Sequence, residues 1–314
     1  MSGYEEIDLR KIKTYSISTR SSKVSTNDFA KSYQKGASLK QFVFDLPDIL
    51  IGEDFKQLAE HIARAFQSNK QTIAMMGAHV IKCGLSPLII QLMQCGVIKC
   101  LALNGAGIIH DTEIANWGTT SEDVAEALND GSFGMVQETA DFINSALESG
   151  QKLKLGLGEA IGKKISESAS PHKKFSILAF GYEHKIPITV HVAIGTDILH
   201  QHPGTDGAVL GELSHRDFKI FCAQVARLTE GSIVLNFGSA VILPEVFLKA
   251  LTVARNLGHN AHGFTTANFD MIRHYRPQVN IVQRPTQTGG KGYHFTGHHE
   301  IMIPLLAAAI LEQI

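Results

Sequence analysis

Residues 72–111 read TIAMMGAHVIKCGLSPLIIQLMQCGVIKCLALNGAGIIHD and contain two short apolar runs with a helical pattern between them. The runs cover 72–77 and 97–105, and the segment 84–96 has the length and apolar spacing of a helix. Because glycine closes each run, we expect a strand, a helix and a second strand joined by short turns. Such a crossover places both strands in parallel in one sheet.

The same alternation continues on both sides of this stretch. A helical pattern over 53–68 precedes it, one or two helices are expected over 121–149, and another helix over about 213–229. Strand-like runs include IPITVHVAIG (186–195) and GSIVLNFG (231–238). Alternating strands and helices with short Gly or Pro turns predict an α/β fold with a doubly wound, mostly parallel sheet and helices on both faces.

The composition changes once along the chain. Residues 1–40 are rich in Ser, Lys and Thr and have few apolar anchors, so we expect a polar N-terminal arm. Residues 41–314 show no second change of composition and no internal repeat, which predicts one α/β domain.

The charge balance excludes some classes of protein. Lys and Arg total 29 against 30 Asp and Glu, which argues against a nucleic-acid binder or a polybasic membrane-surface protein. No apolar run approaches the roughly 20 residues that a membrane span needs. The four cysteines lie in apolar surroundings without a zinc-site spacing, as is typical of reduced thiols in the cytoplasm. A small-molecule enzyme, or an oligomer, fits this composition best.

Parallel sheets bind ligands at the carboxyl ends of their strands, so the residues after each strand are the first candidates. Gly77-Ala78-His79 follows the first run and leads to a helix with Gly84 at an early turn. Asn104-Gly105-Ala106-Gly107 follows the second run. Such small residues let a cofactor phosphate approach the backbone, although a tight strand-to-helix turn needs the same residues.

Histidine is over-represented, with 15 residues. His200 and His202 form an H-x-H pair, and His298 begins another pair, but no established metal motif is present. Their pattern favours histidines that contact a ligand or form hydrogen bonds over a metal site. Lys291 stands between two glycines and is either a phosphate clamp, an imine-forming amine or a solvated turn lysine.

Taken in order, these segments resemble deoxyhypusine synthase and its bacterial relatives over about residues 40–314. The resemblance lies in five segments: GAHVIKCGLSPLIIQLMQCGVIKCLALNGAGIIHD (77–111), KIPITVHVAIGTD (185–197), GSIVLNFGSAVI (231–242), FTTANFD (264–270) and GHHEIMIPLLAAAIL (297–311). It implies a Rossmann-like fold, NAD as cofactor and a homo-oligomer, most simply a tetramer.

The resemblance also implies site residues. The family's NAD contacts fall on Ala78, His79, Asn104, Gly105, Gly107, Asp197, Gly238, Ser239, Thr266, Ala267 and Gly297. Lys291, His110, His200 and His298 are the catalytic candidates, with the histidines as acids and bases.

The chain departs from the family at the amine end of the site. The family's acidic, tryptophan-bearing loop is replaced by RHYRPQVNIVQRP (273–285), whose arginines repel a polyamine and suit an anion. The position of the family's imine-forming lysine falls near Pro285 of this chain. Only a shift of several residues in the alignment brings Lys291 to that position. True deoxyhypusine synthesis is therefore not expected.

Three functional hypotheses remain open. The first is an NAD-dependent transferase that acts on an amine through an imine. The second is a nucleotide- or anion-binding protein or enzyme on the same fold without lysine–imine chemistry. The third is a histidine-rich metal hydrolase. All three take a small-molecule ligand.

Overall fold

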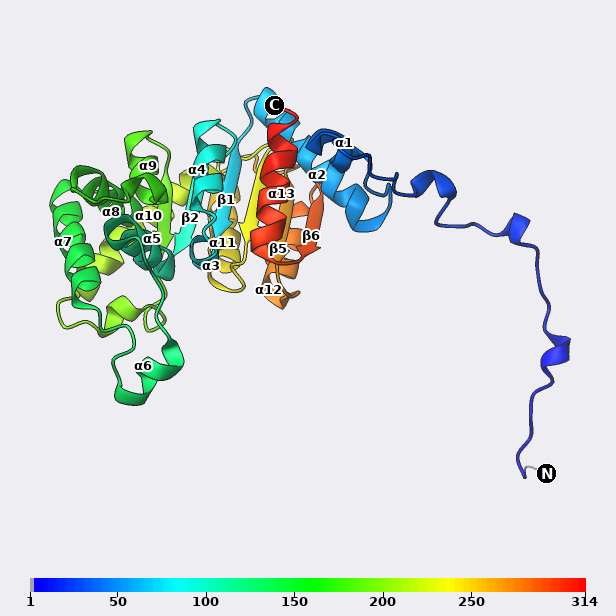
Figure 1. The fold of residues 1–314 in the computed structure, drawn as a ribbon, viewed down its shortest axis with the longest axis horizontal. Helices are drawn as coiled ribbons and strands as arrows, with labels where there is room; N and C mark the ends of the chain where they lie inside the picture. Colours follow the sequence, from blue (N-terminus) through cyan, green and yellow to red (C-terminus); the bar gives the residue numbers. More distant parts are fainter. Residues whose placement is uncertain (1–2) are drawn as a thin grey trace.

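Six strands form a single parallel sheet in a computed structural model of the chain, which describes residues 3–314 (Figure 1). The strands are β1 (Thr72–Met76), β2 (Cys100–Asn104), β3 (Ile188–His191), β4 (Ile233–Phe237), β5 (Thr265–Asp270) and β6 (Gly292–Thr296). Their order across the sheet is β3-β2-β1-β4-β5-β6, and every neighbouring pair is parallel. This confirms the predicted α/β class and gives the Rossmann-like order.

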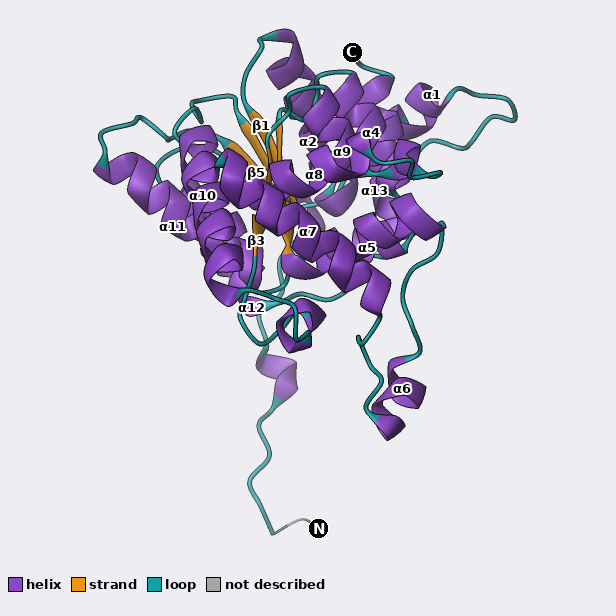
Figure 2. Ribbon diagram, turned by 90° about the vertical axis from the view of Figure 1, so that its left-hand side faces the viewer, coloured by secondary structure: helices purple, strands orange, loops and turns teal. Residues whose placement is uncertain are grey.

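Helices cover both faces of the sheet, as Figure 2 shows. The α-helices of the described residues are α1 (Leu39–Phe44), α2 (Leu50–Gln67), α3 (His79–Lys82), α4 (Ser86–Gln94), α5 (Gly105–Trp117), α6 (Val124–Asp130), α7 (Gln137–Leu153), α8 (Leu157–Glu167), α9 (Ile177–Glu183), α10 (Gly207–Val225), α11 (Ile242–Asn256), α12 (Tyr275–Pro277) and α13 (His299–Leu311), of which α6 projects away from the sheet. A π-helical turn, Gln278–Gln283, follows α12. No helix within residues 3–314 combines the length and the apolarity that a membrane crossing needs.

The core has two layers because side chains alternate between the faces of each strand. Ala74 and Met76 of β1 belong to the cluster that includes side chains of α2, α4 and α13. Ile73 and Met75 belong to the cluster on the other face, with side chains of α10 and α11. All five β1 residues are buried, which explains why this strand has a continuous apolar run.

Most helices lie close to their predicted positions, with two differences. Helix α10 begins at Gly207, earlier than expected, because the Asp206 carboxylate accepts hydrogen bonds from the backbone N–H groups of Ala208 and Val209. The helix expected after His79 is broken: Gly84 has a φ of +75° and separates the four-residue α3 from α4. The prediction of one helix with Gly84 inside it was wrong.

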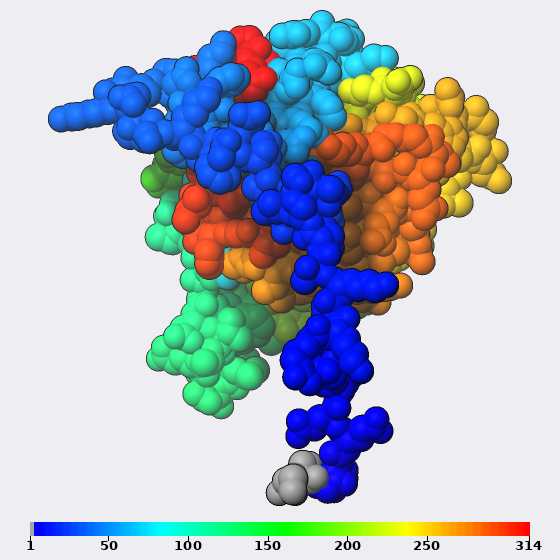
Figure 3. All heavy atoms as spheres, turned by 90° about the vertical axis from the view of Figure 1, so that its right-hand side faces the viewer, coloured from blue at the N-terminus to red at the C-terminus, as the bar shows by residue number. Residues whose placement is uncertain are grey.

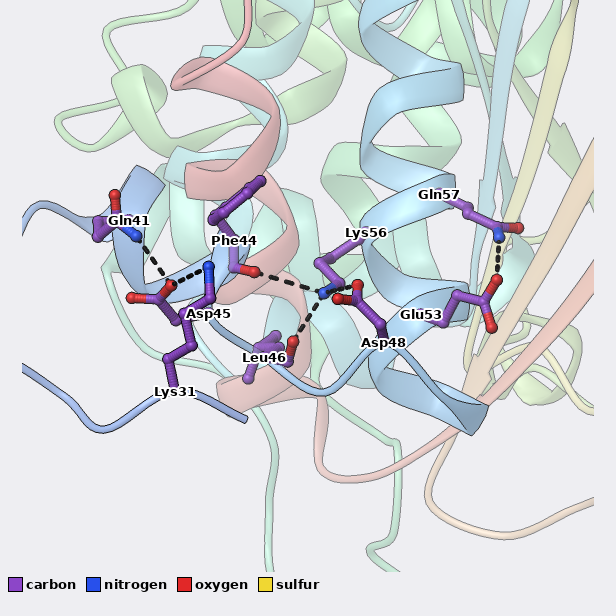
Figure 4. A network of polar contacts seen from close by, with 9 residues as sticks. All are labelled: Lys31, Gln41, Phe44, Asp45, Leu46, Asp48, Glu53, Lys56 and Gln57. Carbon is purple, nitrogen blue, oxygen red and sulfur yellow. Dashed lines mark hydrogen bonds and ion pairs between the residues drawn. The ribbon is translucent and has the colours of Figure 1, made fainter. Parts of the chain in front are cut away.

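The N-terminal segment extends away from the sheet and its helices (Figures 1 and 3). It joins them at a polar network around α1 and α2 (Figure 4). The Lys31 N–H donates to the Asp45 carbonyl at 3.0 Å, and the Asp48 N–H donates to the Asp28 carbonyl at 3.0 Å. Lys56 Nζ of α2 donates to the Leu46 carbonyl at 2.7 Å. These contacts fix where the exposed arm meets the folded body.

Asp217 of α10 connects three elements through one buried carboxylate oxygen. Its Oδ2 accepts the N–H of Gly158 at 2.9 Å and the N–H of Val190 at 2.8 Å, which links α10 to α8 and β3. Its Oδ1 has no hydrogen-bond partner. Burial raises the pKa of Asp217 to about 8, since the two N–H donors do not fully offset the loss of water.

Asp217→Asn tests this account, because the amide oxygen can accept both N–H groups while no charge is buried. In the wild type the folded state holds a proton that the unfolded state releases from about pH 4 upward, so the free energy of unfolding falls as pH rises toward about 8. We expect the free energy of unfolding of the variant, minus that of wild type, to rise over this range in urea titrations.

Asp217→Ala provides the matched control, because it leaves both N–H groups without an acceptor. Like the Asn variant it lacks the titrating carboxyl, so it is expected to be on the order of 3 kcal/mol less stable than Asp217→Asn at every pH in this range. A difference between the Asn variant and wild type that does not change with pH would contradict the proton linkage.

Candidate functional site

Strands β1 and β4 are neighbours although two other strands and several helices separate them in sequence, so their carboxyl ends form the topological switch point. The turns after the two strands touch. A Cβ on Gly77 would lie 2.8 Å from the Gly238 carbonyl oxygen, so only glycine permits this approach. Gly238 has a φ of +67°, and its N–H donates to the Phe269 carbonyl at 2.9 Å.

Two histidines face each other across this switch point. The rings of His79, on α3, and His299, at the start of α13, have centroids 5.9 Å apart. His79 is exposed, whereas His299 is 1% exposed and its Nδ1 has no hydrogen-bond partner. Burial lowers the pKa of His299, which therefore favours its neutral form.

Asp270, the last residue of β5, brings a carboxylate to the same group. Its Oδ1 accepts the Met271 N–H at 2.8 Å, while its Oδ2 is buried without a hydrogen bond and lies 3.9 Å from His274 Nε2. The Asp270 charge acts on His299 and on His294 and partly offsets the lowering of their pKa values by burial. We call His79, Asp270, His294, His298 and His299 the switch-point group.

A row of buried polar side chains leads from the switch-point turn to the edge strand. Asn236, Asn268 and His294 occupy aligned positions on β4, β5 and β6. Asn236 Nδ2 donates to the Ser239 carbonyl at 3.0 Å and to Asn268 Oδ1 at 2.6 Å, and Asn268 Nδ2 lies 3.3 Å from His294 Nδ1. His294 Nε2 and Asn236 Oδ1 have no partner. The row thus ties the Ser239 turn to His294.

A cavity of about 450 Å³ lies on the β2 side of the same edge. It is bounded by α5 and by the segment that carries α6, and Ile109, Trp117 and Phe133 form part of its apolar wall. His110 also lines it, with Nδ1 at 2.6 Å from Thr120 Oγ1. Burial, assisted by the charge of Lys82, lowers the pKa of His110 to about 4, so its imidazole is neutral at neutral pH.

The N-terminus of α5 is already satisfied by the chain itself. Asn104 Oδ1 accepts the Gly107 N–H at 3.1 Å. The Asp197 carboxylate, whose pKa burial raises, lies so close that a Cβ on Gly105 would be 1.9 Å from its Oδ2. Because that carboxylate lies against Gly105, the first residue of the helix, a cofactor phosphate there would have to displace it.

Apart from Lys291, the remaining predicted site residues lie in three places: at the carboxyl edge, inside β5 and beyond β3. Ala78, Gly297 and the exposed His298 lie at the carboxyl edge, His298 with Nδ1 at 3.7 Å from Glu300 Oε1. Ser239 is buried at this edge, where its Oγ accepts the Leu243 N–H at 3.2 Å.

Thr266 and Ala267 lie inside β5 and are fully buried, and Thr266 Oγ1 donates to the Ile281 carbonyl at 2.7 Å. Their side chains do not reach the edge. His200 lies beyond β3, with Nδ1 at 3.2 Å from the Gly195 N–H and a buried Nε2 that has no partner.

Lys291 lies at the opposite edge of the sheet, directly before β6. Its Nζ donates to Gln57 Oε1, lies 3.8 Å from Asp54 Oδ1 and sits 4.8 Å from the centre of the Tyr293 ring. Within one chain it therefore does not meet His110, His200 or His298. In residues 3–314 no three His, Cys, Asp or Glu side chains are placed to hold a metal ion together.

Asn236, Asn268, Asp270, His294 and His299 were not among the predicted site residues. A signal was present, because a polar residue interrupts each of the apolar runs IVLNF, TTANFD and GYHF. Only the strand register shows that three of these positions lie side by side.

Gly238→Ala tests whether the switch-point turn fixes His299. The new Cβ would be 2.4 Å from His299 Nε2, and alanine is strained at this positive φ, so we expect a loss on the order of 2 kcal/mol in thermal unfolding. Gly211→Ala is the control, because Gly211 lies in α10 with open space around it and is expected to gain stability. Equal effects of the two variants would exclude the tight packing.

No protein-family model matches the sequence, and no curated protein matches it. Solved structures match with low identity. The ternary complex of AgrE with ornithine and NAD⁺ has a TM-score of 0.55 at 12% identity and covers 90% of this chain and 34% of that chain. ArgZ, an arginine dihydrolase from the ornithine–ammonia cycle in cyanobacteria, has a TM-score of 0.53 at 16% identity. The match covers 82% of this chain and 31% of the ArgZ chain.

A protein described as a deoxyhypusine synthase from Entamoeba histolytica has a TM-score of 0.53 at 10% identity and covers 90% of this chain and 96% of that chain. The chain thus spans about a third of the AgrE and ArgZ chains (34% and 31%). It spans 96% of the chain described as a deoxyhypusine synthase. At these identities the likeness shows a common fold. The fold of this chain is that of a Rossmann-like α/β protein, similar to the deoxyhypusine synthase fold.

Proposed function

We propose that the chain is an NAD-dependent enzyme that oxidises an amine at the carboxyl edge of its sheet and transfers the resulting carbon group through an imine. The observation that carries this is the set of buried polar atoms without partners at the switch point: His299 Nδ1, Asp270 Oδ2 and His294 Nε2. Buried polar atoms are almost always hydrogen-bonded, so unpaired ones at a ligand-binding edge favour a bound polar molecule. The AgrE complex with NAD⁺ supports the cofactor on the same fold.

The two parts of the edge fit the two halves of a dinucleotide. The cavity of about 450 Å³ has an apolar wall suited to the adenine base, while the switch-point group includes His79 at the start of α3. Lys82, on α3, lines the cavity and supplies a cation between the two parts for the pyrophosphate. Since Asp197 covers the α5 N-terminus, Lys82 is the group we expect to replace the helix end in this role.

The switch-point group supplies the acid–base and binding functions. Asp270 Oδ2 accepts the substrate ammonium, and the exposed imidazoles of His79 and His298 accept its proton. NAD, when bound, supplies the acceptor for the hydride of the carbon next to the nitrogen. With that acceptor, the carbon–nitrogen bond would become an imine, a second substrate amine would displace ammonia from it, and reduction of the new imine would make the reaction redox-neutral. No protein lysine is required, in accord with the position of Lys291 at the other edge.

Exposed apolar side chains near this edge support the expected homo-oligomer. Val241, Met271, Ile272, Tyr275 and Ile301 are between 41% and 73% exposed in a single chain. They follow β4, follow β5 and begin α13, so a neighbouring chain that covered them would also shield the switch-point group from water.

Lys82→Ala tests the cofactor proposal. Loss of the charge-assisted contact to the pyrophosphate is expected to weaken NAD⁺ binding at least about tenfold in calorimetry, and Lys82→Arg is expected to retain most of it. Lys152→Ala, at an exposed position of α7, is the control and is expected to leave the affinity unchanged. Absence of binding of both NAD⁺ and NADH to the folded wild type would refute the proposal.

Asp270→Asn and Lys291→Arg together test the chemistry. Turnover is followed by the ammonia released from a panel of primary amines, because the returned hydride leaves no net NADH. Asp270→Asn removes the charge that holds the ammonium and is expected to lower kcat/KM about a hundredfold. Lys291→Arg is expected to stay within about threefold of wild type, a change below 1 kcal/mol. Loss of turnover in Lys291→Arg would show that a lysine-bound imine is required after all, whereas NAD⁺ binding without turnover on any amine would favour a nucleotide-binding protein.

A further inference from the structure

A second cavity, of about 620 Å³, lies at the amino edge of the sheet, opposite the switch point. Its lining comes from four places: the turn after α2, the turn between α4 and β2, the turn before β3, and the end of α10. The proposed NAD-dependent reaction uses none of these residues. The volume lies within the range of about 300–1,000 Å³ that is usual for small-molecule sites.

The charges in this amino-edge cavity have one sign. Lys99, Lys185 and Arg227 line it, and no Asp or Glu is among its described lining residues. Lys99 Nζ donates to Asn69 Oδ1 at 2.6 Å and to the Lys70 carbonyl at 2.7 Å, so two neutral oxygens hold it without neutralising it. In the described part of the chain, no ion pair is found for Lys185 or Arg227. Three uncompensated cations around one concavity attract an anion.

A neutral donor and the backbone conformation of Lys185 also favour an anion in this cavity. Gln224 is only 7% exposed, and its Oε1 accepts the Gln71 amide at 3.3 Å, which leaves its own amide N–H groups as donors. Lys185 has a φ of +56°, a conformation that glycine or asparagine adopts at lower cost. A lysine at this position keeps its charge at the cavity in spite of that cost.

The remaining lining is apolar. Phe66, Met93, Ile98 and Ile186 form a wall beside the three cations. A purely inorganic anion would leave this wall in water, whereas an organic anion would cover it. The combination selects a ligand with a compact, highly charged head and an apolar or aromatic body.

We propose that the amino-edge cavity binds an organic phosphate monoester, with Lys99, Lys185 and Arg227 around the phosphate and the apolar wall against the organic group. A phosphate monoester carries a charge of about −1.5 to −2 at neutral pH, which matches several cations better than a carboxylate does. Arg227 offers a fork of donors that fits phosphate oxygens. The site is distinct from the edge proposed to bind NAD, and it does not depend on that proposal.

Phenyl phosphate is the probe, titrated into the full chain by calorimetry beside phenol and inorganic phosphate. Phenyl phosphate is expected to bind at least about tenfold more tightly than either, because only it reaches both the cations and the apolar wall. Equal affinity for inorganic phosphate would overturn the assignment to an organic phosphate. No binding of phenyl phosphate at millimolar concentration would overturn the site itself.

Variants locate the binding. Lys185→Gln with Arg227→Gln is expected to weaken phenyl phosphate at least about tenfold, and Arg227→Lys to restore part of the loss relative to Arg227→Gln. Lys219→Gln, which removes a charge from an exposed position of α10 outside the cavity, is the matched control. Circular dichroism checks that each variant is folded.

Lys82→Ala separates this proposal from the NAD site. It is expected to leave phenyl phosphate binding unchanged, and the double glutamine variant is expected to leave NAD⁺ binding unchanged. Loss of phenyl phosphate binding in Lys82→Ala, with no loss in the double variant, would place the ligand at the carboxyl edge and refute the amino-edge site.

Discussion

The pairing of β1 with β4 is the constraint on which the arrangement of the molecule depends. The chain builds β1, β2 and β3 outward in one direction and then returns through α10 to place β4 on the other side of β1. The reversal makes the turns after β1 and β4 meet, with Gly77 and Gly238 in contact. From that contact follow the position of His299 against Gly238 and the short α3 that holds His79 and Lys82.

The two edges of the sheet differ in their electrostatics because different residue types follow and precede the strands. At the carboxyl edge, burial lowers the pKa of His110, His294 and His299 and so favours their neutral forms. At the amino edge, Lys99, Lys185 and Arg227 line a cavity that has no carboxylate among its described lining residues. The carboxyl edge therefore disfavours buried positive charge, whereas the amino edge is suited to binding an anion.

The sequence alone predicted the class of fold well, because buried parallel strands have continuous apolar runs and glycine marks their ends. The runs predicted over 72–77 and 97–105 contain β1 and β2, although β2 begins at Cys100, three residues after its run begins. The candidate site was predicted only in part. Strand-end positions such as His79 and Gly238 follow from the pattern, whereas Asn236, Asn268 and His294 come together only through strand register. Thr266 and Lys291 were also predicted as site residues, but their positions relative to the strands keep both away from the carboxyl edge. One lies inside the sheet and the other before a strand, at the edge away from the switch point.

The carboxylate of Asp217 has a thermodynamic consequence of its own. With its pKa raised to about 8, the folded chain retains a proton at neutral pH that the unfolded chain gives up to the buffer. Unfolding near pH 7 is thus coupled to protonation of the buffer. The heat measured for unfolding then includes the protonation enthalpy of that buffer, and it differs between phosphate and an amine buffer such as Tris even where the free energy of unfolding is the same.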